Sequence, residues 1–261
     1  MLLAVDVGNS HTVLGIFKGK RLIDEWRMQS RRSRKARELW EHVLTFAGEA
    51  GAAPRDIEGV VISSVVPALT RTFAAMTKKY LKMEPVIISG GMDAGIPVLY
   101  DDPSRLGPDR LCNAVAALAI AGAPSIVIDL GTATTFDVVS PKGEYLGGLI
   151  APGVESAAAG LYSHTAQLRP VPLEFPERVV GSNTVTGMQS GIMYGALAGV
   201  EGLVRRIEEA IGEKAPVIAT GGYAEVFAEK SSLITRIEPA LVLEGARLIY
   251  ERVTRKKRKT R

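Results

Sequence analysis

One short pattern that combines a carboxylate, a glycine and hydroxyl groups occurs twice in this chain. It reads Asp6-Val7-Gly8-Asn9-Ser10-His11-Thr12 near the start and Asp129-Leu130-Gly131-Thr132-Ala133-Thr134-Thr135 near the middle. Backbone N–H groups and hydroxyls in a tight turn suit phosphate oxygens, and the carboxylate suits the cation that accompanies them. Two such turns facing each other would hold a nucleotide triphosphate from both sides.

A second candidate for chemistry, Gly107-Pro108-Asp109-Arg110, lies between the two turns. Its Gly-Pro pair delivers Asp109 to the start of a predicted helix, and a helix N-terminus stabilises the ionised form of a carboxylate. We therefore expect Asp109 to be charged at neutral pH and able to accept the proton of a substrate hydroxyl as that oxygen attacks phosphorus. Arg110 could bind an anionic substrate through two N–H groups. The structural alternatives are a helix N-cap for Asp109 and a surface ion pair for Arg110.

Apolar runs predict the elements that position these residues. Each repeated turn follows one run and leads into another, at 2–5 and 13–17 for the first turn and at 126–128 and 136–139 for the second. Each copy therefore predicts a β-hairpin. Helices and strands alternate after each hairpin, which predicts a duplicated α/β architecture. We expect a first domain at 1–117, a second at 118–253 and a basic, disordered tail at 254–261.

The composition favours a folded protein without a disulfide or a metal cluster. The chain has 261 residues, of which 46% are hydrophobic, and this suggests two compact halves. No apolar run reaches the roughly 18 residues of a membrane helix, and no basic region precedes the first apolar run, so neither a membrane span nor a signal peptide is expected. Cys112 is the single cysteine and the three histidines are scattered, which argues against cysteine or histidine metal sites. A cytoplasmic protein fits these features.

The net charge of +4 comes from one end of the chain. Residues 255–261 carry +6, so the rest of the chain carries −2. A basic segment of this kind can hold nucleic acid electrostatically, and a disordered solubilising end is the alternative. The slightly acidic body and the lack of a DNA-reading motif disfavour a nucleic-acid partner.

The usual nucleotide-binding loops are absent from the sequence. It contains neither Gly-x4-Gly-Lys-(Ser/Thr) nor a Gly-x-Gly-x-x-Gly that follows a strand, so the repeated turn is left as the phosphate-binding device. A glycine pair, Gly221-Gly222, follows the predicted strand 217–219. In this order the motifs resemble those of the actin-like superfamily of sugar kinases, actin and chaperone ATPases. The resemblance implies two ribonuclease-H-like domains around ATP, with one turn from each domain and the glycine pair against the adenosine.

The full order of motifs resembles one family in particular, the type III pantothenate kinases, over nearly the whole chain. The elements that carry the resemblance are Asp6-Val7-Gly8-Asn9-Ser10, Tyr100, Gly107-Pro108-Asp109-Arg110, Asp129-Leu130-Gly131-Thr132-Ala133-Thr134-Thr135, Gly147-Gly148-x-Ile150-x-Pro152-Gly153 and Asn183-Thr184-x-x-x-Met188-Gln189-Ser190-Gly191. Pro108 replaces a commonly small residue, Ser10 stands where threonine is usual, and the basic tail lies outside the pattern.

The resemblance implies ATP-dependent phosphorylation of pantothenate, the first step of coenzyme A biosynthesis, with Asp109 as the proton acceptor. It assigns the binding of pantothenate to Tyr100, Gly107, Pro108, Asp109, Arg110 and Thr184. It assigns the binding of ATP to Asp6, Val7, Gly8, Asn9, Ser10, His11, Thr12, Val13, Thr132, Gly221 and Gly222. Asp6 would lie near Mg²⁺, and Asp129 would bind a monovalent cation, K⁺ or NH₄⁺.

The resemblance also implies a homodimer in which the neighbouring subunit completes the pantothenate pocket. Gly187, Gly191, Gly195 and Gly199 recur at every fourth position of a predicted helix at 184–211, so they share one face and would permit close packing.

Alternatives remain for two of these residues and for the activity. Tyr100 could be a packing aromatic beside a proline-rich loop, and Thr184 could be a helix N-cap. One competing hypothesis is a nucleic-acid-binding transcription accessory protein of the same fold that uses the basic tail. Another is a kinase of this superfamily that acts on a different small hydroxylated acid.

Overall fold

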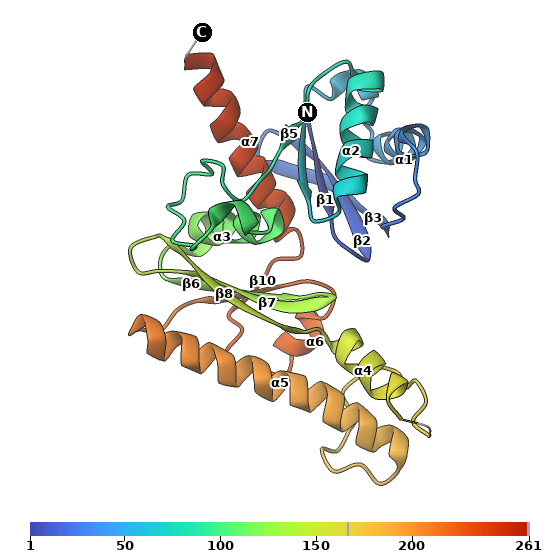
Figure 1. Ribbon diagram of the computed structural model, residues 1–261, viewed down its shortest axis with the longest axis vertical. Helices are drawn as coiled ribbons and strands as arrows, with labels where there is room; N and C mark the ends of the chain where they lie inside the picture. The colour runs from blue at the N-terminus through green and yellow to red at the C-terminus, as the bar shows by residue number, and fades with distance from the viewer. Residues whose placement is uncertain (166, 260–261) are drawn as a thin grey trace. The chain divides into compact units, whose positions relative to one another are not determined.

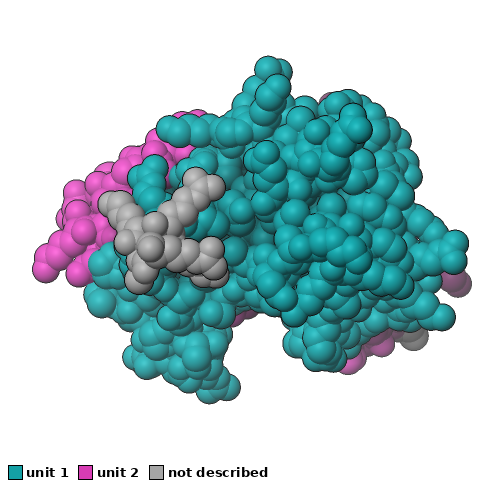
Figure 2. Space-filling view, turned by 90° about the horizontal axis from the view of Figure 1, so that it is seen from above, with its two compact units in different colours: residues 1–116, 240–261 teal, residues 117–239 magenta. Residues whose placement is uncertain are grey.

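The computed structural model describes residues 1–165 and 167–259. They form two compact units, which Figure 2 shows in different colours. Unit 1 consists of residues 1–116 and 240–261, and unit 2 consists of residues 117–239. Among the described residues, no helix combines the length and the apolar character needed to cross a membrane.

Unit 1 is built on a five-stranded sheet in the order β3-β2-β1-β4-β5 (Figure 1). Its strands are β1 (Leu2–Val7), β2 (His11–Lys18), β3 (Arg21–Gln29), β4 (Gly59–Ser64) and β5 (Val86–Ile87). The first three form an antiparallel meander, and β4 pairs in parallel with β1 so that Asp6 lies opposite Ser63. This pairing brings the end of β1, which leads into the first repeated turn, beside the end of β4.

Helices cover both faces of this sheet. The helices of unit 1 are α1 (Ala36–Glu49), α2 (Pro67–Met76), which continues as a π-helical turn (Thr77–Leu81), α3 (Pro108–Ala121), in which the border between the units falls, and α7 (Leu241–Lys259), with short 3-10 turns at Pro54–Asp56 and Pro103–Arg105. Leu3 and Val5 of β1 pack into one core with α1 and α2. On the other face, Gly15 and Gly59 receive Leu243 and Tyr250 of α7. Period-two alternation of the strands explains the two faces.

Unit 2 repeats the same topology. Its sheet has the order β10-β9-β6-β7-β8, which from the opposite edge is again a meander followed by two parallel strands. The elements are β6 (Ser125–Leu130), β7 (Ala133–Val139), β8 (Tyr145–Pro152), α4 (Val154–Ser163), α5 (Thr184–Ile211), β9 (Val217–Thr220), α6 (Ala224–Ala228) and β10 (Arg236–Ile237). Met193 and Val204 of α5 are fully buried against this sheet. The predicted duplicated α/β fold is therefore confirmed.

The last helix differs from the prediction. The sequence placed residues 239–252 in the second domain and a disordered tail after 253, whereas α7 packs on β1 and β4 of unit 1 and remains helical to Lys259. Burial of Leu241, Leu243, Ala246 and Ile249 holds the helix on the sheet. Lysine and arginine are good helix formers and are favoured in a last turn, which accounts for the continuation. Residues 260–261 of the predicted tail lie outside the described residues.

Candidate active site

The first repeated turn joins β1 to β2 in unit 1. Gly8 N donates a hydrogen bond to the carbonyl oxygen of His11 at 2.9 Å, and this bond closes the turn. A Cβ on Gly8 would lie only 3.0 Å from that oxygen, so the tight turn favours glycine. Asn9 and Ser10 are exposed at the tip. The turn therefore offers an amide and a hydroxyl at its surface, as a phosphate-binding turn requires.

Other residues of the first motif are held inside the unit. Val7 and Thr12 are buried, and the Thr12 hydroxyl lies 2.8 Å from the hydroxyl of Ser30. His11 Nδ1 lies 2.9 Å from Nη2 of Arg27, so this ring nitrogen accepts the guanidinium N–H. Among these residues, Val7 and Thr12 can reach a phosphate only through the backbone.

The carboxylate of Asp6 is oriented by a residue that the sequence analysis missed. Ser63, fully buried at the end of β4, donates its hydroxyl hydrogen to Oδ1 of Asp6 at 3.0 Å. A serine at the end of a strand that runs parallel to β1 is the signal that could have identified it, because such strand ends meet at one sheet edge.

The second candidate motif lies at the start of α3. Oδ1 of Asp109 accepts a hydrogen bond from the backbone N of Arg110 at 2.9 Å, and a Cβ on Gly107 would overlap the same oxygen. Glycine at position 107 therefore leaves room for the carboxylate. Arg110 is only 7% exposed, so its side chain does not lie on the surface.

Burial shifts the pKa of Asp109 in the direction opposite to the one that the helix position predicts. Partial burial raises the pKa of Asp109 above its ordinary value of 3.8, although the Arg110 N–H and guanidinium charge oppose the rise. The expected stabilisation of the ionised form by the helix N-terminus is thus outweighed by desolvation. A carboxyl with a raised pKa is the better proton acceptor, because base strength grows with pKa.

A buried cysteine connects this motif with the first turn. Cys112 lies one helical turn after Asp109 and is fully buried. Burial raises the pKa of its thiol well above the usual value, and the negative charges of Asp6 and Asp109 raise it further. Both carboxylates therefore act electrostatically on the same buried thiol of unit 1.

The second repeated turn joins β6 to β7 in unit 2, with Thr132 exposed at its tip. Gly221, at φ +89°, lies against the end of β6, where a Cβ would stand 2.6 Å from Oδ1 of Asp129. Tyr223 N donates to the carbonyl oxygen of Leu130 at 3.3 Å. The glycine pair and the second turn are thus adjacent.

The start of α4 also packs on this turn, which the sequence analysis did not predict. A Cβ on Gly153 would overlap the carbonyl oxygen of Gly131, and Ser156 donates its hydroxyl hydrogen to the carbonyl oxygen of Thr132 at 2.6 Å. The only sequence signal was the Pro152-Gly153 pair that ends β8. Gly153 and Ser156 therefore fix the backbone on which Thr132 is presented.

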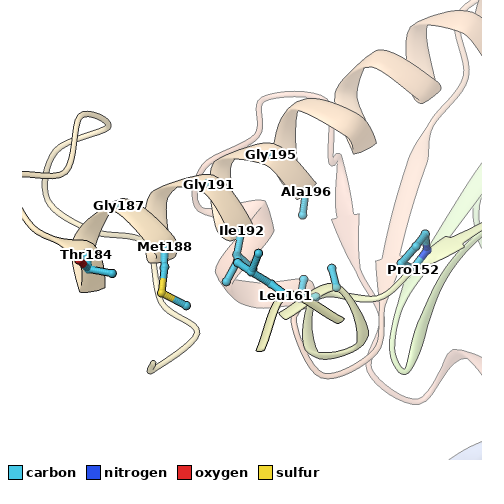
Figure 3. Close-up of a pocket in the computed structure, with 11 residues that line it drawn as sticks. Pro152, Leu161, Thr184, Gly187, Met188, Gly191, Ile192, Gly195 and Ala196 are labelled. Carbon is cyan, nitrogen blue, oxygen red and sulfur yellow. The ribbon is translucent and has the colours of Figure 1, made fainter. Parts of the chain in front are cut away.

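Thr184 begins α5 but does not cap it. The cap is Asn183, whose Oδ1 accepts a hydrogen bond from Thr186 N at 3.0 Å, so the N-cap alternative for Thr184 is wrong. Thr184 is exposed and lines a cavity of about 650 Å³ between α4 and α5 (Figure 3). Most of the lining is apolar, with Leu161, Met188 and Ile192 among its side chains.

The predicted residues divide between the units. Asp6, Tyr100, which is half-buried, and residues 107–110 lie in unit 1. Asp129, Thr132, Thr184 and residues 221–222 lie in unit 2.

The carboxylate of Asp6 suits a magnesium ion that arrives with a nucleotide. Within residues 1–165 and 167–259, no three histidine, cysteine or acidic side chains gather into a metal-binding group. Magnesium in phosphoryl-transfer sites takes one or two carboxylates and completes its shell with substrate phosphates and water. Asp6, oriented by Ser63 beside the phosphate turn, is a suitable ligand of that kind.

Comparison with known proteins places these features in a family. The family model described as type III pantothenate kinase matches residues 2–206. The type III pantothenate kinase of Moorella thermoacetica is 46% identical over 97% of this chain and 100% of that protein. That of Myxococcus xanthus is 43% identical over 97% of this chain and 98% of its own length. These matches support a kinase and give no support to a transcription accessory protein.

A solved structure extends the likeness of fold. Component A of (R)-2-hydroxyglutaryl-CoA dehydratase from Acidaminococcus fermentans has a TM-score of 0.60 and 14% identity, with 97% of this chain and 98% of that chain covered. At this identity the likeness concerns the two-unit fold alone.

Proposed function

The chain belongs to the type III pantothenate kinase family, and from this premise we propose which residues carry out its ATP-dependent phosphorylation of pantothenate. The reaction transfers the terminal phosphoryl group of ATP to the primary hydroxyl of pantothenate and opens coenzyme A biosynthesis. Phosphoryl transfer depends mainly on positioning and on neutralising charge, so the roles below are positions and charges.

Asp109 accepts the hydroxyl proton of pantothenate as the hydroxyl oxygen attacks phosphorus. The observation that carries this role is the geometry around its carboxylate. Gly107 leaves space for Oδ1, the Arg110 N–H fixes it, and burial raises its pKa. The bond from phosphorus to the ADP oxygen breaks as the new P–O bond forms, and the proton ends on Asp109.

Residues 6–13 hold the ATP phosphates in unit 1, and Thr132 and the Gly221-Gly222 pair contact ATP from unit 2. Magnesium bound near Asp6 would neutralise phosphate charge. The packing of Gly153 and Ser156 under Thr132 supports this arrangement, because it rigidifies the second turn.

Tyr100, residues 107–110 and Thr184 bind pantothenate. The nearly buried Arg110 guanidinium suits the pantothenate carboxylate, since a desolvated arginine binds such a group through two N–H bonds. The exposed hydroxyl of Thr184, which is not used as a helix cap, is available for a polar contact.

Asp129 binds a monovalent cation, K⁺ or NH₄⁺. Its carboxylate lies at the second turn, beside the backbone of Gly221. An ADP-release assay with pantothenate in potassium, ammonium or sodium tests this role. Equal rates in all three salts would remove it.

The active form is a homodimer whose second copy completes the pantothenate site. Two observations in unit 2 support this proposal. The cavity between α4 and α5 is apolar and open, and the four glycines at 187, 191, 195 and 199 are exposed with no atom within 4 Å of a Cβ placed on them. A second backbone can approach such a face closely, and burial of the apolar lining would stabilise the contact.

Asp109→Asn tests the central role. We expect kcat with pantothenate to fall at least about a hundredfold, because general-base catalysis contributes roughly 10²–10⁴ in rate. The measurement is coupled ADP release, with ATP affinity followed separately. Asp24→Asn, an equal loss of charge on the exposed part of β3, is the matched control and retains full turnover. Near-wild-type turnover of Asp109→Asn would refute the role.

A further inference from the structure

Residues 88–107, the substrate loop, connect β5 to α3 and carry Tyr100 and Gly107, two of the proposed pantothenate contacts. Only four of its apolar side chains are buried, those of Ile88, Ala94, Ile96 and Leu106. Most of the rest is exposed or half-buried, so the loop needs other contacts to hold one conformation.

Asp93 supplies such a contact with α7, which runs beside the loop in Figure 1. Oδ1 of Asp93 accepts a hydrogen bond from Nε of Arg252 at 3.1 Å and lies 2.9 Å from Nη2 of the same guanidinium. Oδ2 of Asp93 accepts a hydrogen bond from Nζ of Lys256. The two cations stand four residues apart on α7 and therefore share one helix face. Hydrogen bonds from Lys256, which has the larger effect, and from Arg252 lower the pKa of Asp93 to about 2.

The loop backbone is shaped to this contact. Oδ1 of Asp93 also accepts the N–H of Gly95 at 3.2 Å, which closes a small turn. Gly95 has φ +94°, a conformation that other residues rarely adopt. A Cβ there would lie 3.0 Å from Cδ of Arg252, so the arginine side chain lies against the glycine backbone. The contact thus combines charge with close packing.

A second close approach links this region to the far end of the loop. A Cβ on Gly90 would overlap the carbonyl oxygens of Pro103 and Leu106. The start of the loop therefore packs on the segment that immediately precedes Gly107 and Asp109. A shift at residues 93–95 would move this packed pair of segments as well.

We propose that the C-terminal turns of α7 form a strap that fixes the substrate loop, with Asp93 as a positioning residue for pantothenate binding. The proposal rests on the proposed roles of Tyr100 and Gly107. Isolated exposed ion pairs contribute little. Here the single carboxylate of Asp93 contacts two cations and the backbone N–H of Gly95. Several contacts are therefore weakened together when Asp93 changes. Part of the basic end of the chain thereby acquires a role in substrate binding.

Asp93→Asn is the first test, because asparagine keeps an oxygen for the Gly95 N–H but removes the charge and the oxygen that accepts a hydrogen bond from Lys256. We expect KM for pantothenate to rise about fivefold, the effect of losing a small network. KM for ATP and kcat should change less than about twofold, since the phosphate turns are untouched. Glu41→Gln, which breaks the exposed Arg37–Glu41 pair on α1 of the same unit, is the control and leaves all three constants unchanged. An unchanged KM for pantothenate, or an equal rise in both KM values, would overturn the proposal.

A double-mutant cycle tests the contact itself. If the strap acts through Asp93 and Arg252, Arg252→Gln should raise KM for pantothenate as Asp93→Asn does. The double variant should then be no worse than the more impaired single variant. Fully additive effects would show that the two residues act separately and would overturn the strap.

Hydrogen exchange without substrates separates this idea from the proposed function. Asp93→Asn should speed exchange of backbone N–H groups in residues 93–107, whatever ligand the loop binds. Unchanged exchange would overturn the strap. Faster exchange with unchanged pantothenate KM would instead overturn the assignment of pantothenate to this loop.

Discussion

The carboxyl of Asp109 is where the demands of stability and catalysis oppose each other. Its pKa is raised because the folded protein partly buries it. Burial makes it a stronger base, and it also makes the ionised form costly in the folded state. Gly107 and the Arg110 N–H hold the oxygen in place against that cost.

Asp109→Asn should therefore stabilise the protein while it lowers turnover. The folded protein holds the Asp109 proton more tightly than the unfolded chain does. The wild-type free energy of unfolding therefore falls as pH rises from the ordinary pKa of 3.8 through the raised one. At pH 7 the variant avoids this loss, and we expect a higher Tm than that of the wild type. Thermal unfolding of the variant and the wild type at pH 7 and below pH 3.8 measures this difference in Tm. A gain that persists at the acid pH would contradict the explanation.

The pH profile of kcat/KM gives a second measure of the same carboxyl. A proton acceptor must be ionised, so the rate should fall as pH is lowered through the raised pKa, with a midpoint above 3.8. An acid limb centred at or below 3.8 would show that a different carboxyl controls the rate.

Much of the residue-level site could be predicted, and the failures share a cause. Asp6, Asn9, Ser10, Thr132 and Gly221 lie where local turn patterns put them. Ser63, Gly90 and Gly153 were missed because each matters through a neighbour far along the chain. The direction of the Asp109 pKa shift was missed for the same reason. Helix position can be read from sequence, but burial by distant segments cannot.

At the scale of elements, α7 and α3 of unit 1 approach each other closely at one glycine. A Cβ on Gly245 of α7 would overlap the backbone of Cys112 on α3. The contact seats α7 against the helix that carries Asp109, one turn away from it.

Gly245→Ala should lower the free energy of unfolding by about 1–3 kcal/mol, because the added methyl group meets backbone that cannot move aside easily. Gly48→Ala on α1 is the control, since a Cβ there meets nothing within 4 Å. It should be neutral or stabilising by up to about 1 kcal/mol, because alanine favours the helix. Urea unfolding of both variants compares them. Equal stability of the two would show that α7 can shift without cost.

The two hairpins were predictable and the place of α7 was not. Each hairpin depends on apolar runs next to a glycine turn, which are visible within about twenty residues. The sequence of α7 predicts a helix with an apolar face, but nothing local says which sheet that face covers. The complementary features are Gly15 and Gly59, which admit Leu243 and Tyr250 from more than 180 residues away.

At the scale of the whole molecule, the proposed dimer makes the glycine face of α5 a functional surface. Its four glycines leave the helix backbone exposed beside the apolar cavity that contains Thr184. Glycine in a helix costs roughly 1 kcal/mol relative to alanine, so four of them are a notable cost unless a second copy packs there.

Gly191→Gln tests this surface. A Cβ at this position meets no atom within 4 Å, so each subunit should fold normally. A second copy could no longer approach, and light scattering should show a monomer where the wild type is a dimer. Turnover of pantothenate should fall with the loss of the dimer. Gly48→Gln, on an exposed helix position of unit 1, is the control. A dimer with full turnover in Gly191→Gln would place the interface elsewhere.

The return of α7 to the first sheet has a consequence for synthesis on the ribosome. Unit 2 is one uninterrupted stretch, whereas unit 1 needs residues from both sides of it. Translation releases residues 117–239 before α7 exists, so the later stretch can fold while the earlier sheet still has one face bare. The nascent chain thus exposes Gly15, Gly59 and their apolar neighbours to chaperones until its final turns emerge.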